Sequence, residues 1–351
     1  MNTVRIAVAG AGLIGLRHIE EIGRCGRTTL AAIVDVAPKA AEVARAAGVP
    51  LYASLAELFA KEKPEGIVLA TPNQMHVEQG LECIAAGVPA LIEKPVAHSV
   101  AEGVRLCEAA ERAGAKILVG HHRRHSPILH RAVGIVRSGV LGPLVGVIGS
   151  AVFYKPDADG YYDGPNAWRR RPGGGPILLN LIHEIGNLRA MVGEIAAVGA
   201  FASNATRGFE VEDTVAINLR FSNGALGTFL LSDTAASPKS WEQTARENLA
   251  YAAVDDEDAY TIIGTMGSLG VPTMRLRCYE KASDRSWFKP FVTRTEPLER
   301  ADPLAGQIEH FAAVIRGEAA PLVTCRDGLA NLRVTEAVVE AARTGRPVEI
   351  A

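Results

Sequence analysis

The stretch Ala90–Ser99, ALIEKPVAHS, ends an apolar run in a carboxylate, an amine and a proline. A lysine at the end of a buried strand can exchange a proton with a substrate hydroxyl when its surroundings lower its pKa. The simpler interpretation is a surface Lys94 that pairs with Glu93 and does no chemistry. The neighbouring motifs decide between the two.

Glycines with dinucleotide spacing lie near the N-terminus, in VAGAGLIGLRH. In Gly10-x-Gly12-x-x-Gly15 the first glycine permits a tight turn, the second lets the backbone approach a pyrophosphate, and the third lets helix pack on strand. The helix that begins near Leu13 and Ile14 directs its N–H groups at the anion. A glycine-rich turn without a ligand is the alternative, but the flanking strand and helix patterns favour a dinucleotide site.

The choice of cofactor depends on Asp35, which ends the second strand about 20 residues after Gly15. A carboxylate there accepts hydrogen bonds from both ribose hydroxyls and repels a 2′-phosphate. No arginine immediately follows it, because the next residues are Val36-Ala37-Pro38, and Lys39 is the one residue that would favour the phosphate. The sequence therefore predicts NAD, with NADP less favoured.

Two further strand ends face the same crevice, because ligands of open parallel sheets bind beyond the carboxyl ends of the strands. The fourth strand ends in LATPNQMH and the fifth in LIEKP. We expect both to contact the cofactor, through Thr71, Pro72, Asn73, His76, Glu93 and Lys94.

The elements that position these residues alternate along the first 120 positions. Short apolar runs, such as Val4–Ala9 and Gly66–Ala70, are separated by amphipathic stretches such as Val100–Ala113. This pattern predicts an α/β fold with a doubly wound parallel Rossmann sheet, assigned to a domain at 1–123. From about Leu144 the strands alternate apolar and polar residues, which predicts an α+β domain at 124–351 with a large, mainly antiparallel open sheet.

Composition excludes several classes of protein. The 351 residues carry a net charge of −2 and only 5% aromatic residues, which gives no support for nucleic acid or membrane as a partner. No signal peptide and no membrane span is expected, so the prediction is a cytoplasmic protein. The five scattered cysteines, Cys25, Cys83, Cys107, Cys278 and Cys325, are expected to be reduced, buried thiols.

The order and spacing of GAGLIG, Asp35, TPNQMH and EKP resemble the glucose–fructose oxidoreductase, inositol dehydrogenase and rhizopine-catabolism (Gfo/Idh/MocA) family. The resemblance covers nearly the whole chain, including the C-terminal RGEAAPLVTCRDGLANLRVTEAVVEAARTGRPVEI. It implies that Lys94 lies beside the nicotinamide and the reacting hydroxyl. It also implies that Glu93 and Pro95 shape the turn, with a cis Lys94–Pro95 peptide.

The second catalytic element of that family is an aspartate followed four residues later by a histidine, after a glycine cluster. In GGGPILLNLIHEIG, His183 matches the histidine, whereas Leu179 replaces the aspartate. Asn180 lies on the same helix face and can orient substrate or His183, but it cannot act as an acid. We therefore expect Lys94 and His183 to share the proton chemistry; a histidine satisfied in the core is the alternative.

Three more stretches carry candidate binding residues. In VGHHRRHSP, the resemblance places His122 and Arg123 or Arg124 near the nicotinamide ribose and substrate; no metal is predicted, because adjacent strand residues point to opposite faces. In NAWRRRPGGG, Trp168 and Arg169 are expected at the cofactor or the neighbouring substrate. The polar segment 232–258, with Asp233, Trp241 and Glu242, has the character of a loop that closes over a substrate.

Together these features predict an NAD-dependent dehydrogenase of a secondary hydroxyl on a sugar, cyclitol or sugar acid. Alternatives are a dihydrodiol dehydrogenase acting on a ring carboxylate, a lyase or hydrolase that oxidises its substrate transiently, and a non-catalytic dinucleotide-bound sensor. Retention of Lys94 and His183 disfavours the sensor. The open sheet is expected to join copies of the chain in a homodimer or homotetramer.

Overall fold

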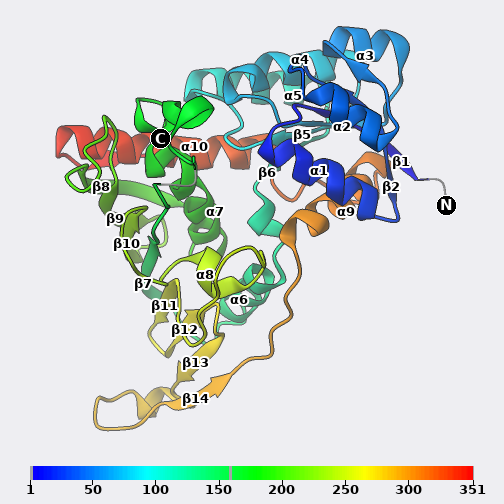
Figure 1. Ribbon diagram of the computed structural model, residues 1–351. Helices are drawn as coiled ribbons and strands as arrows, with labels where there is room; N and C mark the ends of the chain where they lie inside the picture. Colours follow the sequence, from blue (N-terminus) through cyan, green and yellow to red (C-terminus); the bar gives the residue numbers. More distant parts are fainter. Residues whose placement is uncertain (1–2, 158–159, 351) are drawn as a thin grey trace. The chain divides into compact units, whose positions relative to one another are not determined.

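The computed structural model describes residues 3–157 and 160–350, which divide into two compact units (Figure 1). The first unit comprises Met1–His125 and Asp302–Leu332, and the second comprises Ser126–Ala301 and Arg333–Ala351. The sequence-based division assigned everything after residue 123 to the second domain. The structure differs at Asp302–Leu332, because the apolar side chains Ile308 and Phe311 are buried in the core of the first unit.

The first unit contains a six-stranded parallel sheet with the strand order β3-β2-β1-β4-β5-β6. Strands β4, β5 and β6 are buried along their whole length, as expected when helices cover both faces of a parallel sheet. The order reverses between β1 and β4, and this switch point is where open α/β sheets bind their ligands. The strands are β1 Val4–Ala9, β2 Thr28–Val34, β3 Leu51–Tyr52, β4 Gly66–Leu69, β5 Ala90–Glu93 and β6 Ile117–Gly120.

The helices of the first unit follow the periodic stretches of the sequence closely. Ser99 caps the start of α5 through its hydroxyl, and Gly114 ends that helix in a left-handed conformation. Helix α9, orange in Figure 1, lies beside α1. The helices are α1 Leu13–Arg24, α2 Ala40–Ala47, α3 Leu55–Lys61, α4 His76–Ala86, α5 Val100–Ala113 and α9 Pro303–Arg316, with short 3-10 turns at Asn73–Met75 (η1) and His122–His125 (η2).

The second unit contains a nine-stranded sheet with the order β14-β13-β12-β11-β7-β10-β9-β8-β15. Only the β7–β10 pair is parallel among the pairs described, so the predicted mainly antiparallel sheet is confirmed. Its strands are β7 Leu144–Val152, β8 Ile195–Ser203, β9 Thr214–Phe221, β10 Leu226–Ser232, β11 Tyr260–Gly264, β12 Gly267–Val271, β13 Arg275–Cys278, β14 Val292–Thr295 and β15 Val348–Glu349. The sequence did not indicate β12 or β14, whereas the family resemblance of the C-terminal stretch implied a closing strand, which is β15.

One face of this sheet packs on helices and the other is open. Inward-facing Val147, Val215 and Phe229 share a core with Leu129 of α6 and Ile185 of α7. The opposite face carries Ile148, Leu226 and Leu230, which are 59%, 61% and 44% exposed. The helices of this unit are α6 Pro127–Arg137, α7 Ile182–Met191 and α8 Trp241–Ala245, with shorter turns at Gly164–Arg170 (η3), Ile177–Leu181 (η4) and Ala282–Asp284 (η5).

The longest helix, α10, spans Cys325–Thr344, and the division between the units falls inside it. Its N-terminal part contributes Leu329 and Leu332 to the core of the first unit. Its C-terminal part contributes Val338 and Ala341 to the core of the second unit. Over the residues described, no helix combines the length and apolar character needed to cross a bilayer.

The cysteines correct one prediction. Cys107 of α5 and Cys325 of α10 are joined in a disulfide, with their Cα atoms 5.4 Å apart. The sequence led us to expect reduced thiols, because 218 positions separate the pair and no spacing pattern connects them. Folding brings the two helices together, since Gly103 of α5 leaves room for the Leu329 side chain of α10. Cys83 and Cys278 are buried free thiols.

Candidate active site

The glycine-rich turn between β1 and α1 needs two of its glycines for packing. Gly10 has φ +89°, and a Cβ there would lie 2.6 Å from the carbonyl oxygen of Ala70. A Cβ on Gly15 would lie 1.8 Å from the carbonyl oxygen of Gly10. Both positions exclude a side chain because protein backbone occupies the space.

Gly12 differs, because a Cβ built on it would meet no protein atom within 4 Å. It is the N-cap of α1, and among the described residues no side chain caps the first turn of the helix. Leu13 beside it is 76% exposed, and Ile14 is partly exposed. The start of the helix therefore presents uncapped N–H groups beside open space at Gly12, which fits the pyrophosphate of a dinucleotide.

Replacing Gly12 by alanine tests this fit. The backbone there, at φ −76° and ψ −167°, suits any residue, so the free energy of unfolding should change by less than about 1 kcal/mol. The added methyl group would fill the space of the pyrophosphate, so NAD affinity measured by calorimetry should fall at least about tenfold. Gly23→Ala, at an equally uncrowded position of α1, is the matched control and should keep full affinity. Equal NAD binding by both variants would contradict the assignment.

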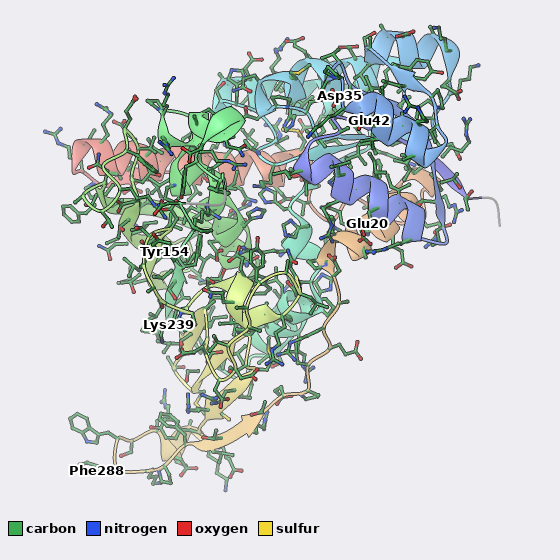
Figure 2. The ribbon with its side chains drawn as sticks, viewed as in Figure 1. Glu20, Asp35, Glu42, Tyr154, Lys239 and Phe288 are labelled. Atoms are coloured by element: carbon green, nitrogen blue, oxygen red, sulfur yellow. A yellow bond between two sulfur atoms is a disulfide. The ribbon has the colours of Figure 1, made fainter. Side chains whose placement is uncertain are left out.

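Asp35 lies just beyond the end of β2 and next to this turn (labelled in Figure 2). Its carboxylate accepts the Ala11 N–H at 2.6 Å and the Ala37 N–H at 2.7 Å. These bonds hold the carboxylate against the glycine loop, while each oxygen keeps a second lone pair for a ribose hydroxyl. The structure thus brings Asp35 together with Gly10, Gly12 and Gly15.

The turn after β4 contains Thr71, Pro72 and Asn73, which are partly or fully exposed at the carboxyl edge of the sheet. His76 is 1% exposed, and its ring nitrogens lie 2.8 Å from the Pro95 carbonyl oxygen and 2.9 Å from that of Thr71. Burial lowers the pKa of His76. His76 thus connects the turns after β4 and β5, a structural contact that the sequence did not indicate.

The EKP triplet ends β5, and the Lys94–Pro95 peptide is cis, as expected. One Glu93 oxygen lies 2.8 Å from the His18 Nε2 atom of α1, and the other accepts the Lys94 N–H at 3.1 Å. Burial by itself would raise the pKa of Glu93, but the His18 bond and nearby positive charges outweigh it and lower this pKa to about 2. A buried carboxylate therefore fixes the backbone of Lys94, and the Lys94 side chain is partly exposed.

The HHRRH stretch forms the short turn after β6. Burial first, and then the charge of Arg123, lowers the pKa of His122 to about 3, so its ring is neutral near pH 7. His121 is buried, and its Nε2 atom lies 3.1 Å from the amide nitrogen of Asn331 in α10. Across residues 3–157 and 160–350, no three His, Cys, Asp or Glu side chains gather as a metal-binding group.

In the second unit, the glycine cluster leads into the histidine helix. Gly173 and Gly175 have φ values of +96° and +79°, which favour glycine. A Cβ on Gly175 would collide with the Glu212 carboxylate, and that carboxylate accepts the Ile177 N–H at 2.9 Å. Glu212 thus anchors the start of the helical segment that carries Asn180 and His183. Burial raises the pKa of Glu212.

Asn180 lies in a π-helical turn, Ile177–Leu181, a type of irregularity frequent at functional sites. Its Oδ1 accepts a hydrogen bond of 2.6 Å from Lys155. His183 lies in the first turn of α7 and is 9% exposed, and Leu179 occupies the place of the family's aspartate. Lys94 and His183 belong to different units, and their cooperation stays a prediction.

Trp168 and Arg169 lie in η3, ahead of the glycine cluster. Trp168 is 48% exposed, and the Arg169 guanidinium lies 4.0 Å above the Tyr161 ring and 5.6 Å from the Trp168 ring. The sequence analysis did not single out Lys155 or Tyr161. No sequence motif marks these two residues. Only folding brings Lys155 into contact with both Tyr161 and Asn180.

In the segment 232–258, two of the three side chains singled out from the sequence are buried rather than open to a substrate. Trp241 and Asp233 are each 3% exposed. The Trp241 N–H donates to Glu247 at 2.7 Å and its ring packs against Tyr260, while Asp233 accepts a hydrogen bond from the Tyr162 hydroxyl. The polar sequence suggested a loop that closes over a substrate, because composition does not show these internal partners, and Tyr162 lies 71 positions from Asp233 in the chain.

Comparison with known proteins gives matches over both units. The family model for "Oxidoreductase family, NAD-binding Rossmann fold" matches residues 4–121, and that for "Oxidoreductase family, C-terminal alpha/beta domain" matches residues 135–350. The chain is 29% identical to 1,5-anhydro-D-fructose reductase of Ensifer adhaerens, over 85% of this chain and 83% of that protein. It is 25% identical to inositol 2-dehydrogenase of Rhizobium meliloti, over 99% of this chain and 100% of that protein.

A solved structure with the same fold is the WlbA dehydrogenase of Bordetella pertussis in complex with NADH and UDP-GlcNAcA. The TM-score is 0.78 at 24% identity, with 100% of this chain and 99% of that chain covered. At this identity the likeness shows the fold.

Proposed function

The chain belongs to the Gfo/Idh/MocA oxidoreductase family, and we propose that it is an NAD-dependent dehydrogenase of a secondary hydroxyl on a sugar, cyclitol or sugar acid. The observation that carries the proposal is the uncapped helix start at Gly12, with the Asp35 carboxylate bonded to the same loop. Lys94 follows β5 at the same carboxyl edge of the sheet. Family relatives named for sugar and inositol chemistry support the substrate class.

The residues present fit NAD, whose nicotinamide supplies the hydride acceptor when bound. Gly10, Gly12, Leu13, Ile14 and Gly15 would hold the pyrophosphate, and Asp35 the adenosine ribose. We assign contacts along the rest of the cofactor to Thr71, Pro72, Asn73, Glu93, Lys94 and His122. His76 would hold the turns after β4 and β5 in place through its contacts with the Thr71 and Pro95 carbonyl oxygens. Trp168 and Arg169 are proposed to contact the cofactor or the neighbouring substrate.

In the proposed reaction, the Lys94 Nζ atom accepts the proton of the substrate hydroxyl as the carbinol carbon is oxidised. Glu93 holds the Lys94 backbone so that the amine stays aimed at one position. His183 takes part in the same proton transfer, and Asn180 orients the substrate or His183. The protein thus contributes orientation and proton transfer, and the cofactor carries the redox chemistry.

Replacing Asp35 by alanine should weaken NAD binding more than NADP binding. The carboxylate would contact both hydroxyls of the NAD ribose and repel the 2′-phosphate of NADP. Losing one charge-assisted contact should cost NAD about tenfold or more in affinity, and NADP affinity should stay unchanged or rise. Calorimetric titration with both nucleotides measures the ratio. A parallel loss for both would show that Asp35 only shapes the loop through Ala11 and Ala37.

A second candidate function is oxidation of a dihydrodiol hydroxyl on a ring that carries a carboxylate. One relative supports a carboxylate-bearing substrate: the chain is 34% identical over 126 residues, 35% of its length and 40% of that protein, to a 4-carboxy-2-hydroxymuconate-6-semialdehyde dehydrogenase of a Sphingobium strain. The same residues would serve this substrate, so only turnover separates it from a sugar dehydrogenase.

We also propose association of copies through the open sheet face of the second unit. Ile148, Leu226 and Leu230 form an exposed apolar stripe across β7 and β10, which are hydrogen-bonded neighbours. Two such faces packed together would bury the stripe by the symmetric solution common in oligomers. Light scattering of the purified protein gives the number of subunits. The proposal includes a cytoplasmic location, where NAD is abundant.

The test of function is NADH formation by the purified protein across sugars, inositols, aldonic acids and dihydrodiols, with NADP in parallel. Turnover confined to one substrate class would establish the activity and name the class. No turnover on any substrate, together with NAD binding in calorimetry, would overturn the dehydrogenase proposal and favour the sensor or the redox-cycling lyase.

A further inference from the structure

We propose that Lys155 and Arg169 form a receptor for a carboxylate group of the substrate, so that the substrate is a sugar acid or another hydroxy acid. This inference deepens the function proposed above and rests on it. Lys155 follows the end of β7, one residue after Tyr154, which is labelled in Figure 2. Arg169 lies in η3, and all contacts used below lie within the second unit.

Lys155 is held by two neutral acceptors. Its ammonium donates to the Tyr161 hydroxyl at 2.9 Å and to the Asn180 Oδ1 atom at 2.6 Å, and it lies 4.5 Å from the centre of the Tyr161 ring. An ammonium group has three N–H donors, so one is left for a further acceptor. The side chain is partly exposed, and no carboxylate among the described residues forms a salt bridge with it.

Arg169 also lacks an anionic partner among the described residues. Its Nη1 donates to the Tyr161 carbonyl oxygen at 2.8 Å, and its guanidinium stacks 4.0 Å above the Tyr161 ring. Its Nε atom is buried without an acceptor within the described part of the chain. The adjacent Arg170, in contrast, pairs with Asp163. Both Lys155 and Arg169 thus contact Tyr161 and keep unused donors.

The buried carboxylate of Asp233 forms its hydrogen bonds with other residues than Lys155 and Arg169. One oxygen of Asp233 accepts the Tyr162 hydroxyl, and the other accepts the Arg207 Nε at 3.2 Å. Arg207 also pairs with Asp157. Asp233 and Asp157 therefore bond to Arg207, and neither forms a salt bridge with Lys155 or Arg169. The charges of Asp233 and Glu242 still act on Lys155 at longer range, without a hydrogen bond to it among the described residues.

The ligand chemistry follows from the donors. A guanidinium and an ammonium together suit a planar carboxylate, which can accept from both at once. Asn180, the partner of Lys155, belongs to the turn that leads into His183, three residues on. A carboxylate held here would lie near the proposed proton-transfer segment, as in a hydroxy acid with its reacting carbinol a few bonds from the acid group.

The pKa of Lys155 agrees with this role. Burial is the main cause that lowers this pKa, the charges of Asp233 and Glu242 raise it, and those of Arg169 and Arg207 lower it, with a net value of about 8. The amine is mostly protonated at pH 7 and loses its proton as pH rises through about 8, whereas a substrate carboxylate stays ionised. Affinity for the acid should therefore fall on going from pH 7 to pH 9.

The test compares acids with neutral partners of the same carbon chain. D-gluconate and D-galactonate are set against their alditols, and D-glucuronate and D-galacturonate against the parent sugars, with binding to the NADH-loaded protein measured by calorimetry. We expect at least one acid to bind at least about tenfold more tightly than its neutral partner. Binding of none of the acids, or equal binding of acid and neutral partner, would overturn the receptor.

Variants then locate the binding. Lys155→Met and Arg169→Gln should each weaken the acid about tenfold or more and leave the neutral partner unchanged, whereas Lys155→Arg, which keeps the charge, should retain most of the affinity. Lys281→Met, at an exposed lysine of the same unit, is the control. Melting temperatures without ligand identify a variant that fails to fold. In that case the test uses Lys155→Arg, whose affinity for the acid should stay constant from pH 7 to pH 9, because arginine keeps its charge there.

The outcomes separate the two proposals. Acid binding that depends on Lys155, without NADH formation from any alcohol, would contradict the proposed dehydrogenase function and support the carboxylate receptor. Oxidation of neutral polyols, with no acid binding, would support the dehydrogenase function and contradict the carboxylate receptor.

Discussion

Replacing Lys94 by alanine is expected to reduce turnover by about a thousandfold while NAD still binds. A positioned general base contributes about a hundredfold to ten-thousandfold to rate, and no other group at the end of β5 offers an amine. The loss should appear in kcat, because the lysine acts on the reacting hydroxyl and does not hold the pyrophosphate loop. Steady-state kinetics and NAD calorimetry on the same preparation measure the two effects separately.

Two comparisons sharpen this result. Lys63→Ala removes an exposed lysine of the same unit and should leave kcat unchanged. Lys94→Arg keeps a positive charge but cannot act as a base at neutral pH, so it should be nearly as inactive as the alanine variant. Turnover that survives in Lys94→Ala would assign the proton transfer to another residue and leave Lys94 as a surface lysine.

Replacing Glu93 by glutamine should lower the free energy of unfolding by about 2–3 kcal/mol. The carboxylate is 4% exposed and bonded both to His18 and to the Lys94 N–H, and hydrogen bonds to charged groups contribute about 1.5–3 kcal/mol each. Urea unfolding at pH 7 measures the loss. Glu42→Gln, at an exposed glutamate of α2 labelled in Figure 2, is the control and should cost less than about 0.5 kcal/mol.

The pH dependence of this difference has a definite sign. The pKa of Glu93 is about 2 in the folded protein and about 4.3 in an unfolded chain, so its stabilisation is fully present above pH 4.3. It is lost as the pH falls toward 2, because the unfolded chain takes up the proton first. The gap between wild type and Glu93→Gln should therefore narrow from pH 6 to pH 3. A constant gap would mean that the carboxylate is not the stabilising group.

Glu93→Gln should also affect catalysis, since the carboxylate fixes the backbone of Lys94. We expect kcat to fall by less than in Lys94→Ala, because the amine remains. An unchanged kcat at a lowered melting temperature would limit Glu93 to a structural role.

The helices and strands of the first unit were predictable because their signals are local. Strand β1 and helix α5 have the bounds expected from the sequence, and β4 and β5 differ from expectation by a single residue at their ends. Continuous apolar runs and periodic helices reflect burial of whole elements, which each segment encodes by itself. The short strands β12 and β14 escaped prediction, because their pairing with β13 depends on partners, and β14 is exposed throughout.

Side-chain roles were less accessible than elements. The sequence marked Asp35 and His76 equally as cofactor residues, yet His76 is buried between two carbonyl groups. Trp241 belongs to a polar segment whose composition suggested a binding loop, but its side chain is buried in the core. Buried polar and aromatic side chains form hydrogen bonds with the groups that folding brings close to them. The spacing of residues along the chain does not identify those partners.

By itself the sequence predicted the dinucleotide loop, because its tight turn and close packing require glycine at fixed intervals. It also predicted the acidic residue after the loop and the lysine at the end of β5, because their order and spacing match a family pattern. Only the tertiary structure decided which side chains meet across 75 to 218 positions of the chain. It joined Cys107 to Cys325 and set Glu93 against His18. Over a shorter span it also placed Lys155 on Asn180. Such contacts arise when packed elements bring distant side chains within a few ångströms, and no local propensity encodes that distance.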